Sequence, residues 1–172
     1  MKKAIALILS LMIAIASAAA CAESLEWKGG ETNGIMPAGA FCTFEEAGLK
    51  AWIPSYMNEV ELTEEDKSNG FIAYFSQSDN SHMISAVYVD TESLKTQEDY
   101  MKALETVEGV SDISAITING APAVFYNLKE NETSTVAIIE GNGKIFELTV
   151  YPTTGDEDLA AALYIFSSIQ PK

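Results

Sequence analysis

The fold is decided by residues 135–151, which read TVAIIEGNGKIFELTVY. Two runs of strand-forming residues flank Gly141-Asn142-Gly143, and this arrangement is typical of a β-hairpin. Residues 136–139 are apolar at every position, whereas a strand with one face in water alternates between apolar and polar residues. Other parts of the chain must therefore cover both faces of this strand.

Further strands extend the pattern on both sides of this hairpin. Residues 113–118 and 123–128 flank Asn119-Gly120, a pair that readily adopts the positive φ angles of a tight type I′ turn. The run Phe71–Phe75 is also apolar throughout, which again predicts a strand covered on both faces. Earlier strands are expected at residues 41–44, 49–53, 71–76 and 83–89.

Helices supply the expected cover. Thr154 and Glu157 have the spacing of a helix N-cap, and the helix that follows places Leu159, Leu163 and Phe166 on one stripe. Similar caps, Thr63 with Asp66 and Thr96 with Asp99, predict a short helix ending near residue 69 and a longer one over residues 97–107. The pattern predicts an α+β fold, an α/β/α sandwich with a mainly antiparallel sheet of about seven strands.

The order of these elements resembles the PsbP/Mog-like α/β/α family over residues 40–170. The resemblance is carried by Gly48–Ser55 (GLKAWIPS), the helix at Gln97–Val107, Ile116–Ala123 (ITINGAPA) leading to Tyr126, and the closing helix. Members of this family include photosystem assembly subunits, a binder of a nuclear transport GTPase, and bacterial envelope lipoproteins. The shared motifs are structural, so the resemblance implies a non-catalytic binding or assembly module.

The N-terminus has the pattern of an export signal. Lys2 and Lys3 precede an apolar stretch over residues 4–15, and a run of small residues ends at Ala22. The apolar stretch is shorter than the roughly 20 residues that a membrane-spanning helix needs. We expect a signal peptide over residues 1–22, a polar tether over residues 23–39, and one globular domain over residues 40–172.

Two processing routes fit the end of this signal. The sequence Ala18-Ala19-Ala20-Cys21 resembles a bacterial lipobox, in which the cysteine receives a lipid and becomes the new N-terminus, although Ala18 stands where that motif usually has leucine. Ordinary cleavage after Ala20 or Ala22 also fits the rule of small residues. The glycine-bearing polar stretch that follows favours Cys21 as a lipid attachment site.

Composition excludes one class of partner. The chain has 25 acidic residues against ten lysines, has no arginine, and carries a formal net charge of −15. Proteins gain most of their affinity for nucleic acids from basic side chains, and this surface would repel a phosphate backbone. No nucleic acid is expected as a partner, and membrane contact is expected only through the lipid at Cys21.

Trp52 and Tyr56 are the candidate ligand-binding residues. Lys50 and Trp52 have the opposite strand parity to Leu49 and Ile53, so Trp52 either packs beneath a helix or lines a groove near residues 56–69. An envelope protein or a small ligand is the expected partner, and no cofactor or metal is expected.

Two other functions remain open from the sequence. A small extracellular enzyme could use paired carboxylates, or Cys42 with His82, although an isolated histidine in a turn and a cysteine in an apolar strand are more typical of structural residues. A calcium-dependent adhesion domain could use Glu45-Glu46 and Glu64-Glu65-Asp66. The leading hypothesis is a non-catalytic envelope protein that binds or assembles.

Overall fold

The computed structural model describes residues 25–27 and 38–172. Its central element is an eight-stranded sheet in which all pairings are antiparallel except that of β1 with β7. In spatial order the strands are β1 (Leu25–Trp27), β7 (Val110–Ile118), β8 (Ala121–Leu128), β9 (Thr133–Ile139), β10 (Lys144–Tyr151), β6 (Met83–Asp90), β5 (Phe71–Ser76) and β4 (Asn58–Glu59). The expectation of a large, mainly antiparallel sheet is confirmed.

A second, smaller sheet corrects the expected strand count and layering. It consists of β11 (Gln170–Pro171), β3 (Leu49–Pro54) and β2 (Gly39–Phe44), with β3 in the middle. The sequence predicts β2 and β3 as strands but does not show that they leave the main sheet. They form a separate layer because Phe44, Ala51 and Ile53 point into the core against the main sheet, where all three are buried.

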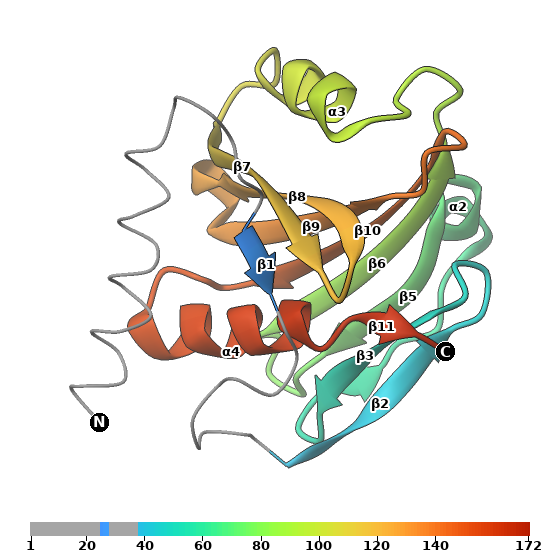
Figure 1. Cartoon of the computed structure of the whole chain (residues 1–172). Coiled ribbons are helices and arrows are strands. Elements are labelled where there is room, and N and C mark those ends of the chain that lie inside the picture. Colours follow the sequence, from blue (N-terminus) through green and yellow to red (C-terminus); the bar gives the residue numbers. More distant parts are fainter. Residues whose placement is uncertain (1–24, 28–37) are drawn as a thin grey trace.

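Both faces of the main sheet are covered by other elements (Figure 1). The helix α4 (Asp156–Ser167) and the small sheet lie against one face, and α3 (Gln97–Leu104) lies against the other. The short α2 (Glu64–Ser68) packs beside β5, and a 3-10 turn, η1 (Lys129–Asn131), follows β8. The layers are therefore one helix, the main sheet, and a mixed layer of helix and small sheet.

Strand β9 is covered on both faces, as its sequence predicts. Val136 and Ile138 belong to the core beneath α4, whereas Ala137 and Ile139 belong to the core beneath α3. Strand β5 differs, because Ala73 and Phe75 are buried while Ile72 and Tyr74, which alternate with them, are only half-buried. The second face of β5 is therefore only partly covered, since α3 packs mainly on β7 and β8, and the short α2 packs beside β5.

The predicted helix caps are confirmed for α2 and α3 and corrected for α4. Thr63 with Asp66, and Thr96 with Asp99, form reciprocal capping boxes. Helix α4 starts after Gly155 without a side-chain cap, one residue beyond the predicted Thr154. Its buried face carries Ala162, Ile165, Phe166 and Ile169, and Leu163 is only half-buried.

The turn at Asn119-Gly120 has the predicted positive φ angles, 48° and 85°. The Asn119 side chain also joins the main sheet to the layer that contains α4, because Asn119 Nδ2 donates to the carbonyl oxygens of Ser167 and Ile169 at 3.2 and 2.6 Å. These carbonyls lie at the end of α4, where no further helical turn can satisfy them. The turn therefore holds the C-terminal end of α4 against β7 and β8.

Strand β1 lies within the stretch expected to be a tether. Leu25, Glu26 and Trp27 pair in parallel with β7, opposite Ile116, Thr117 and Ile118. The Trp27 ring centroid lies 5.6 Å from that of Phe125 and 6.5 Å from that of Phe166, so this strand is part of the packed domain. The predicted signal peptide and Cys21 lie outside the described residues. Within residues 25–27 and 38–172, no helix is long and apolar enough to cross a bilayer.

Candidate functional site

The outward face of the small sheet carries a group of aromatic side chains. Phe41 and Trp52 are directly opposite on β2 and β3, with ring centroids 5.5 Å apart at an interplanar angle of 81°. The ammonium group of Lys50 lies 5.8 Å from the centroid of the Phe41 ring. Phe41 is 47% exposed, which is unusual for a side chain of that size. We call Phe41, Lys50 and Trp52 the aromatic patch.

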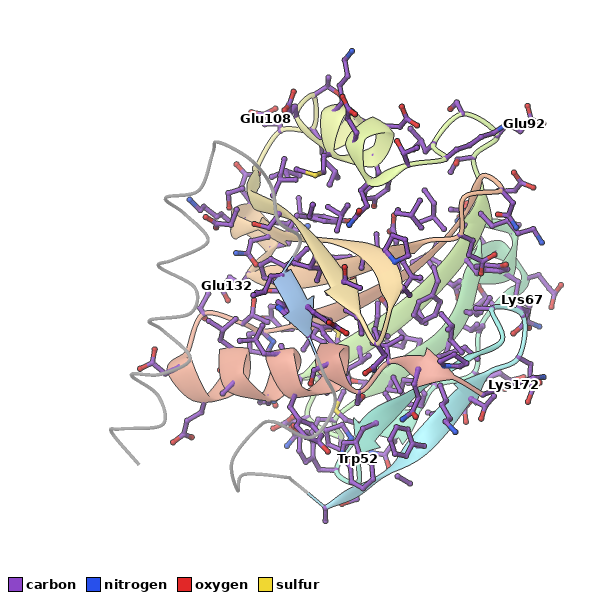
Figure 2. All side chains as sticks on the ribbon, in the orientation of Figure 1. Trp52, Lys67, Glu92, Glu108, Glu132 and Lys172 are labelled. Carbon is purple, nitrogen blue, oxygen red and sulfur yellow. The ribbon has the colours of Figure 1, made fainter. Side chains whose placement is uncertain are left out.

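Trp52 is held in place from two sides. Its backbone N–H donates to Ser168 Oγ at 2.8 Å, and its ring meets Tyr164 of α4 edge-on at 6.5 Å. A Cβ at Gly39 would lie 2.8 Å from Trp52 Nε1 and 2.4 Å from the carbonyl oxygen of Ile53, so only glycine fits there without a shift. Trp52 thus packs beside α4 and still presents a partly exposed ring on the outward face (Figure 2).

The indole N–H of Trp52 lacks a protein acceptor. Nε1 is buried and makes no hydrogen bond within the part of the chain that the structure describes. Buried indole donors usually find a partner, because leaving one unpaired costs free energy. Trp52 therefore combines partial exposure with an unused donor.

Tyr56 lies near one end of the small sheet, in the turn after β3, and is 42% exposed. Its ring meets the His82 imidazole edge-on at a centroid distance of 6.1 Å. Partial burial raises the pKa of the Tyr56 phenol, and the nearby negative charge of Asp158 raises it further. The phenol therefore stays protonated at neutral pH and can donate a hydrogen bond to a ligand.

His82 joins the turn before β6 to the start of α4. One imidazole nitrogen, Nδ1, lies 2.9 Å from Ser81 Oγ, and the other, Nε2, lies 3.2 Å from Asp158 Oδ1. Ser81 Oγ in turn donates to Asp79 at 2.7 Å. Because the Ser81 proton goes to Asp79, Ser81 is not arranged to give its proton to the histidine as a nucleophilic serine would.

Cys42 does not have the environment of a nucleophile. Burial raises the pKa of its thiol, and the charge of Glu59 raises it further, whereas reactive cysteines have lowered pKa values. Its side chain packs against the core, and the hydrogen bonds of His82 go to Ser81 and Asp158. The geometry gives no support to a catalytic pair of Cys42 and His82.

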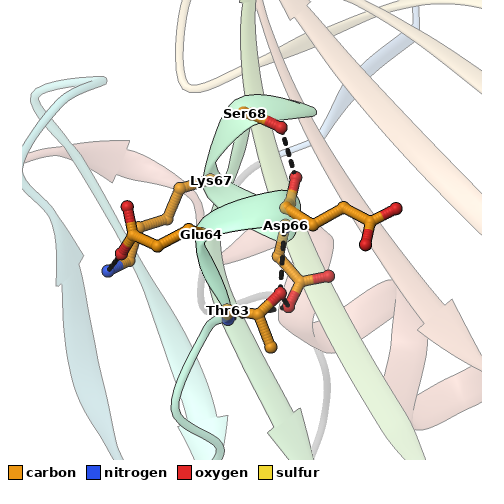
Figure 3. A network of polar contacts seen from close by, with 6 residues as sticks. Thr63, Glu64, Asp66, Lys67 and Ser68 are labelled. Carbon is orange, nitrogen blue, oxygen red and sulfur yellow. Dashed lines mark hydrogen bonds and ion pairs between the residues drawn. The ribbon is translucent and has the colours of Figure 1, made fainter.

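Three of the acidic residues considered for calcium have local partners. Asp66 accepts hydrogen bonds from Thr63 as part of the α2 cap, and Glu64 pairs with Lys67 at 2.8 Å (Figure 3). Glu45 pairs with Lys172 at 2.8 Å. Among the described residues, no group of three or more histidine, cysteine or acidic side chains is arranged to hold a metal ion. The observed contacts assign Asp66 to helix capping, and Glu45 and Glu64 to surface ion pairs.

A polar cluster beneath α3 was missed by the sequence reasoning. Tyr100 of α3 donates a hydrogen bond to the carboxyl group of Glu147 on β10, and the Tyr126 ring lies 6.3 Å from that of Tyr100. Burial raises the pKa of Glu147, and burial followed by the nearby Glu147 charge raises the pKa of Tyr126 to about 12. One signal could have found it, because Glu147 shares its strand parity with Ile145 and so points towards the covered face.

An open groove of about 560 Å³ lies between the start of α3 and the β7–β8 turn. Its walls are mostly apolar, with Leu49, Pro122 and Ile138 among them, and Lys95 and Glu140 contribute one charge of each sign. The amide nitrogen of Gln97 is not available to a ligand in the groove, since Nε2 donates to the carbonyl oxygens of Ile116 and Ala123 at 2.7 and 2.6 Å. The groove offers few polar groups that could orient a ligand.

Comparison with known proteins shows the fold. No protein-family model matches the chain, and none of the curated proteins matches it. The solution structure of cyanobacterial PsbP (CyanoP) from Synechocystis sp. PCC 6803 is similar with a TM-score of 0.57, at 16% identity, over 83% of this chain and 98% of that protein. The chain has a PsbP-like fold. A crystal structure of a protein from Bacteroides thetaiotaomicron VPI-5482 is more distantly similar, with a TM-score of 0.45 at 15% identity, over 73% of this chain and 46% of that one.

Proposed function

We propose that this chain is an exported, lipid-anchored protein of the cell envelope that binds a partner without catalysis. One observation carries the binding role. Four large apolar side chains are strongly exposed among the described residues, and the two aromatic ones lie on or beside the small sheet, Phe41 on β2 and Tyr56 in the turn after β3. Aromatic residues of this kind are enriched where proteins meet their partners. The PsbP-like fold fits the non-catalytic role that the family resemblance implies.

Anchoring at Cys21 would place the domain close to the bilayer. Strand β1 begins at Leu25, only four residues after Cys21. An extended chain spans at most about 3.5 Å per residue, so a lipid on Cys21 would hold Leu25 within about 14 Å of its attachment point. The edge of the main sheet formed by β1 would then lie close to the membrane.

The anchor is tested by replacing the cysteine. The parent protein is expected in the membrane fraction, with an N-terminal mass that includes a lipid on Cys21, and Cys21→Ser is expected to block processing or release the protein. An unmodified N-terminus at Cys21 or Glu23 by intact-mass analysis would contradict lipid anchoring. That result would leave the binding role untouched.

The binding role is tested by substituting two apolar residues that are equally exposed. Phe41→Ser and Val107→Ser each remove a side chain that is close to half exposed, 47% and 48%, so neither is expected to lower stability by more than about 1.5 kcal/mol, the larger loss being at Phe41 because of its contact with Trp52. Val107 follows α3, on the opposite side of the main sheet from the aromatic patch. Crosslinking in intact cells is expected to yield a partner that is lost with Phe41→Ser and retained with Val107→Ser. Equal capture by both variants would contradict the proposed surface.

A further inference from the structure

The outer edge of the small sheet is an unpaired strand. Strand β3 lies between β11 and β2, so only one side of β2 has a neighbour among the described strands (Figure 1). Strand β2 is six residues long, pairs with β3 without a bulge, and contains neither a charged residue nor a proline. Natural proteins usually protect edge strands with lysine, proline or a bulge, because a bare edge pairs with other chains. Strand β2 has none of these protections.

The hydrogen bonds of β3 show which backbone groups of β2 are free. Trp52 N–H donates to Ser168 Oγ, and the carbonyl oxygen of Gly48 accepts from Lys172 N–H, so the Trp52 N–H and the Gly48 C=O both point away from β2. In an antiparallel ladder, successive residues turn these groups to opposite sides. Leu49, Ala51 and Ile53 therefore bond to β2, and Lys50 and Trp52 do not.

The register transfers this alternation to β2. Phe41 pairs with Trp52 and Thr43 with Lys50, so the N–H and C=O groups of Phe41 and Thr43 point away from β3. The hydrogen bond from Ser55 N–H to the carbonyl oxygen of Ala38, at 2.7 Å, has the same parity and supports the assignment. Four backbone groups on alternate residues are thus available to one added strand, beside the exposed Phe41 ring.

The charges around this edge favour a basic strand. Glu45 and Glu46 follow β2 directly, and the charge of Glu59 acts on Cys42 in the middle of the strand. Glu45 is paired with Lys172 and Lys50 adds one positive charge on the outward face, so Glu46 and Glu59 supply the negative charge at this edge. A second copy of this chain would bring its own Glu46 and Glu59 to the same edge, and each copy carries a formal net charge of −15. Like charges across a contact disfavour association, whereas lysine or arginine side chains at these positions would attract it.

We propose that β2 is the docking site for an extended, lysine- or arginine-bearing segment of a partner polypeptide, which adds to the small sheet as a fourth strand. Its backbone bonds to Phe41 and Thr43, and its side chains on one face lie against the aromatic patch. This mode of recognition gains affinity from main-chain hydrogen bonds and specificity from alternate side chains. The proposal rests on the binding role given above and names its site and its partner class.

The test uses a synthetic octapeptide of alternating valine and lysine. Every second backbone nitrogen is methylated, so that only one edge of the peptide can bond and the peptide cannot stack on itself. On titration into the purified protein, nuclear magnetic resonance is expected to show shifts of the Phe41 and Thr43 amides and slower hydrogen exchange at both. A peptide with glutamate in place of lysine is expected not to bind. The absence of binding by the lysine peptide, or shifts centred elsewhere, would overturn the proposal.

Two variants at one position test the backbone contact. Thr43→Pro removes an outward-facing N–H without removing a bond to β3, and it is expected to weaken peptide binding by up to about tenfold, as the loss of one hydrogen bond predicts. Thr43→Val keeps the N–H and is expected to bind as the parent does. Equal binding by Thr43→Pro, or a dimer formed through β2 without peptide, would overturn the proposal. If Thr43→Pro does not fold, the comparison of the lysine and glutamate peptides on the parent protein still tests the proposal, because equal binding of the two peptides would overturn it.

The outcomes separate this inference from the binding role. If the peptide fails to bind while crosslinked capture still depends on Phe41, the aromatic patch binds a partner of another kind and the β2 proposal is wrong. If capture is independent of Phe41 while the lysine peptide binds at β2, the edge accepts strands but the proposed surface is not the one used in the cell.

Discussion

The two faces of the main sheet are built from different side chains. On the face covered by α4 and the small sheet, the buried cluster is apolar and joins elements from both ends of the chain, Phe44 and Phe166 among them. On the face covered by α3, a smaller apolar cluster lies beside Glu147 and Tyr100, and Thr135 Oγ1 lies 2.8 Å from Thr149 Oγ1. The first face supplies packing energy, and the second combines packing with polar groups that must satisfy one another.

The largest expected effect is on the apolar face. Phe166 is fully buried against Trp27 and Phe125, so Phe166→Ala is expected to lower the free energy of unfolding by about 3–5 kcal/mol. Leu104→Ala removes a buried residue of the smaller cluster and is expected to cost about 2 kcal/mol. Denaturant titrations at one pH compare the two. Equal losses would contradict the difference between the faces.

A pH-dependent effect is expected on the polar face. Burial is the main reason that the pKa of Glu147 is raised in the folded state. The folded protein therefore favours the protonated carboxyl group. This contribution to stability is fully present below the unfolded-state pKa of about 4.3 and is lost as the pH rises through the folded-state pKa. Between these two pKa values the free energy of unfolding of the parent is expected to fall by up to about 1.4 kcal/mol per pH unit, and Glu147→Gln is expected to abolish this fall. Unfolding measured from pH 4 to pH 8 checks this. Parallel curves for the parent and Glu147→Gln would contradict the buried carboxyl group.

Tyr100→Phe sharpens the same test. The hydrogen bond from Tyr100 lowers the pKa of Glu147 and so partly opposes the effect of burial. Removing the hydroxyl group is expected to raise the folded-state pKa of Glu147, so that the loss of stability begins at the same pH but continues to higher pH. A shift to lower pH would show that Tyr100 does not donate to this carboxyl group.

The smallest effect is expected at the sheet surface. Lys144 is exposed at the start of β10, and its ammonium group lies 5.4 Å from the centroid of the Tyr88 ring. Lys144→Ala is expected to change the free energy of unfolding by about 0.5 kcal/mol or less, since exposed cation–π contacts are weak. A loss above about 1 kcal/mol in a denaturant titration would show that this contact supports the fold.

Local features of the fold were predictable from the sequence. The Asn119-Gly120 turn and the Thr63 and Thr96 caps follow from residues a few positions apart, and all three are confirmed. The apolar run at residues 136–139 also correctly predicted two covered faces. These features depend on short-range hydrogen bonds and on strand parity, both of which a sequence records directly.

Long-range pairings were not predictable in the same way. Parity shows which side chains of β2 and β3 share a face, but it does not show that β11 pairs with β3 or that β1 adds to β7. The sequence singled out Trp52 but missed Phe41, because exposure of an aromatic residue depends on which strands lie beside it. Glu147 was missed for a related reason, since only the docked α3 makes its position buried.

Hydrogen exchange along β2 tests the free edge most directly. The structure predicts that the amides of Ala40, Cys42 and Phe44, which face β3, exchange slowly, while those of Phe41 and Thr43 exchange at rates close to those of an exposed chain. Alternation of fast and slow exchange along the strand would confirm an edge open to a partner. Uniform protection of all five amides in the purified protein would contradict it, because another strand would already occupy the edge.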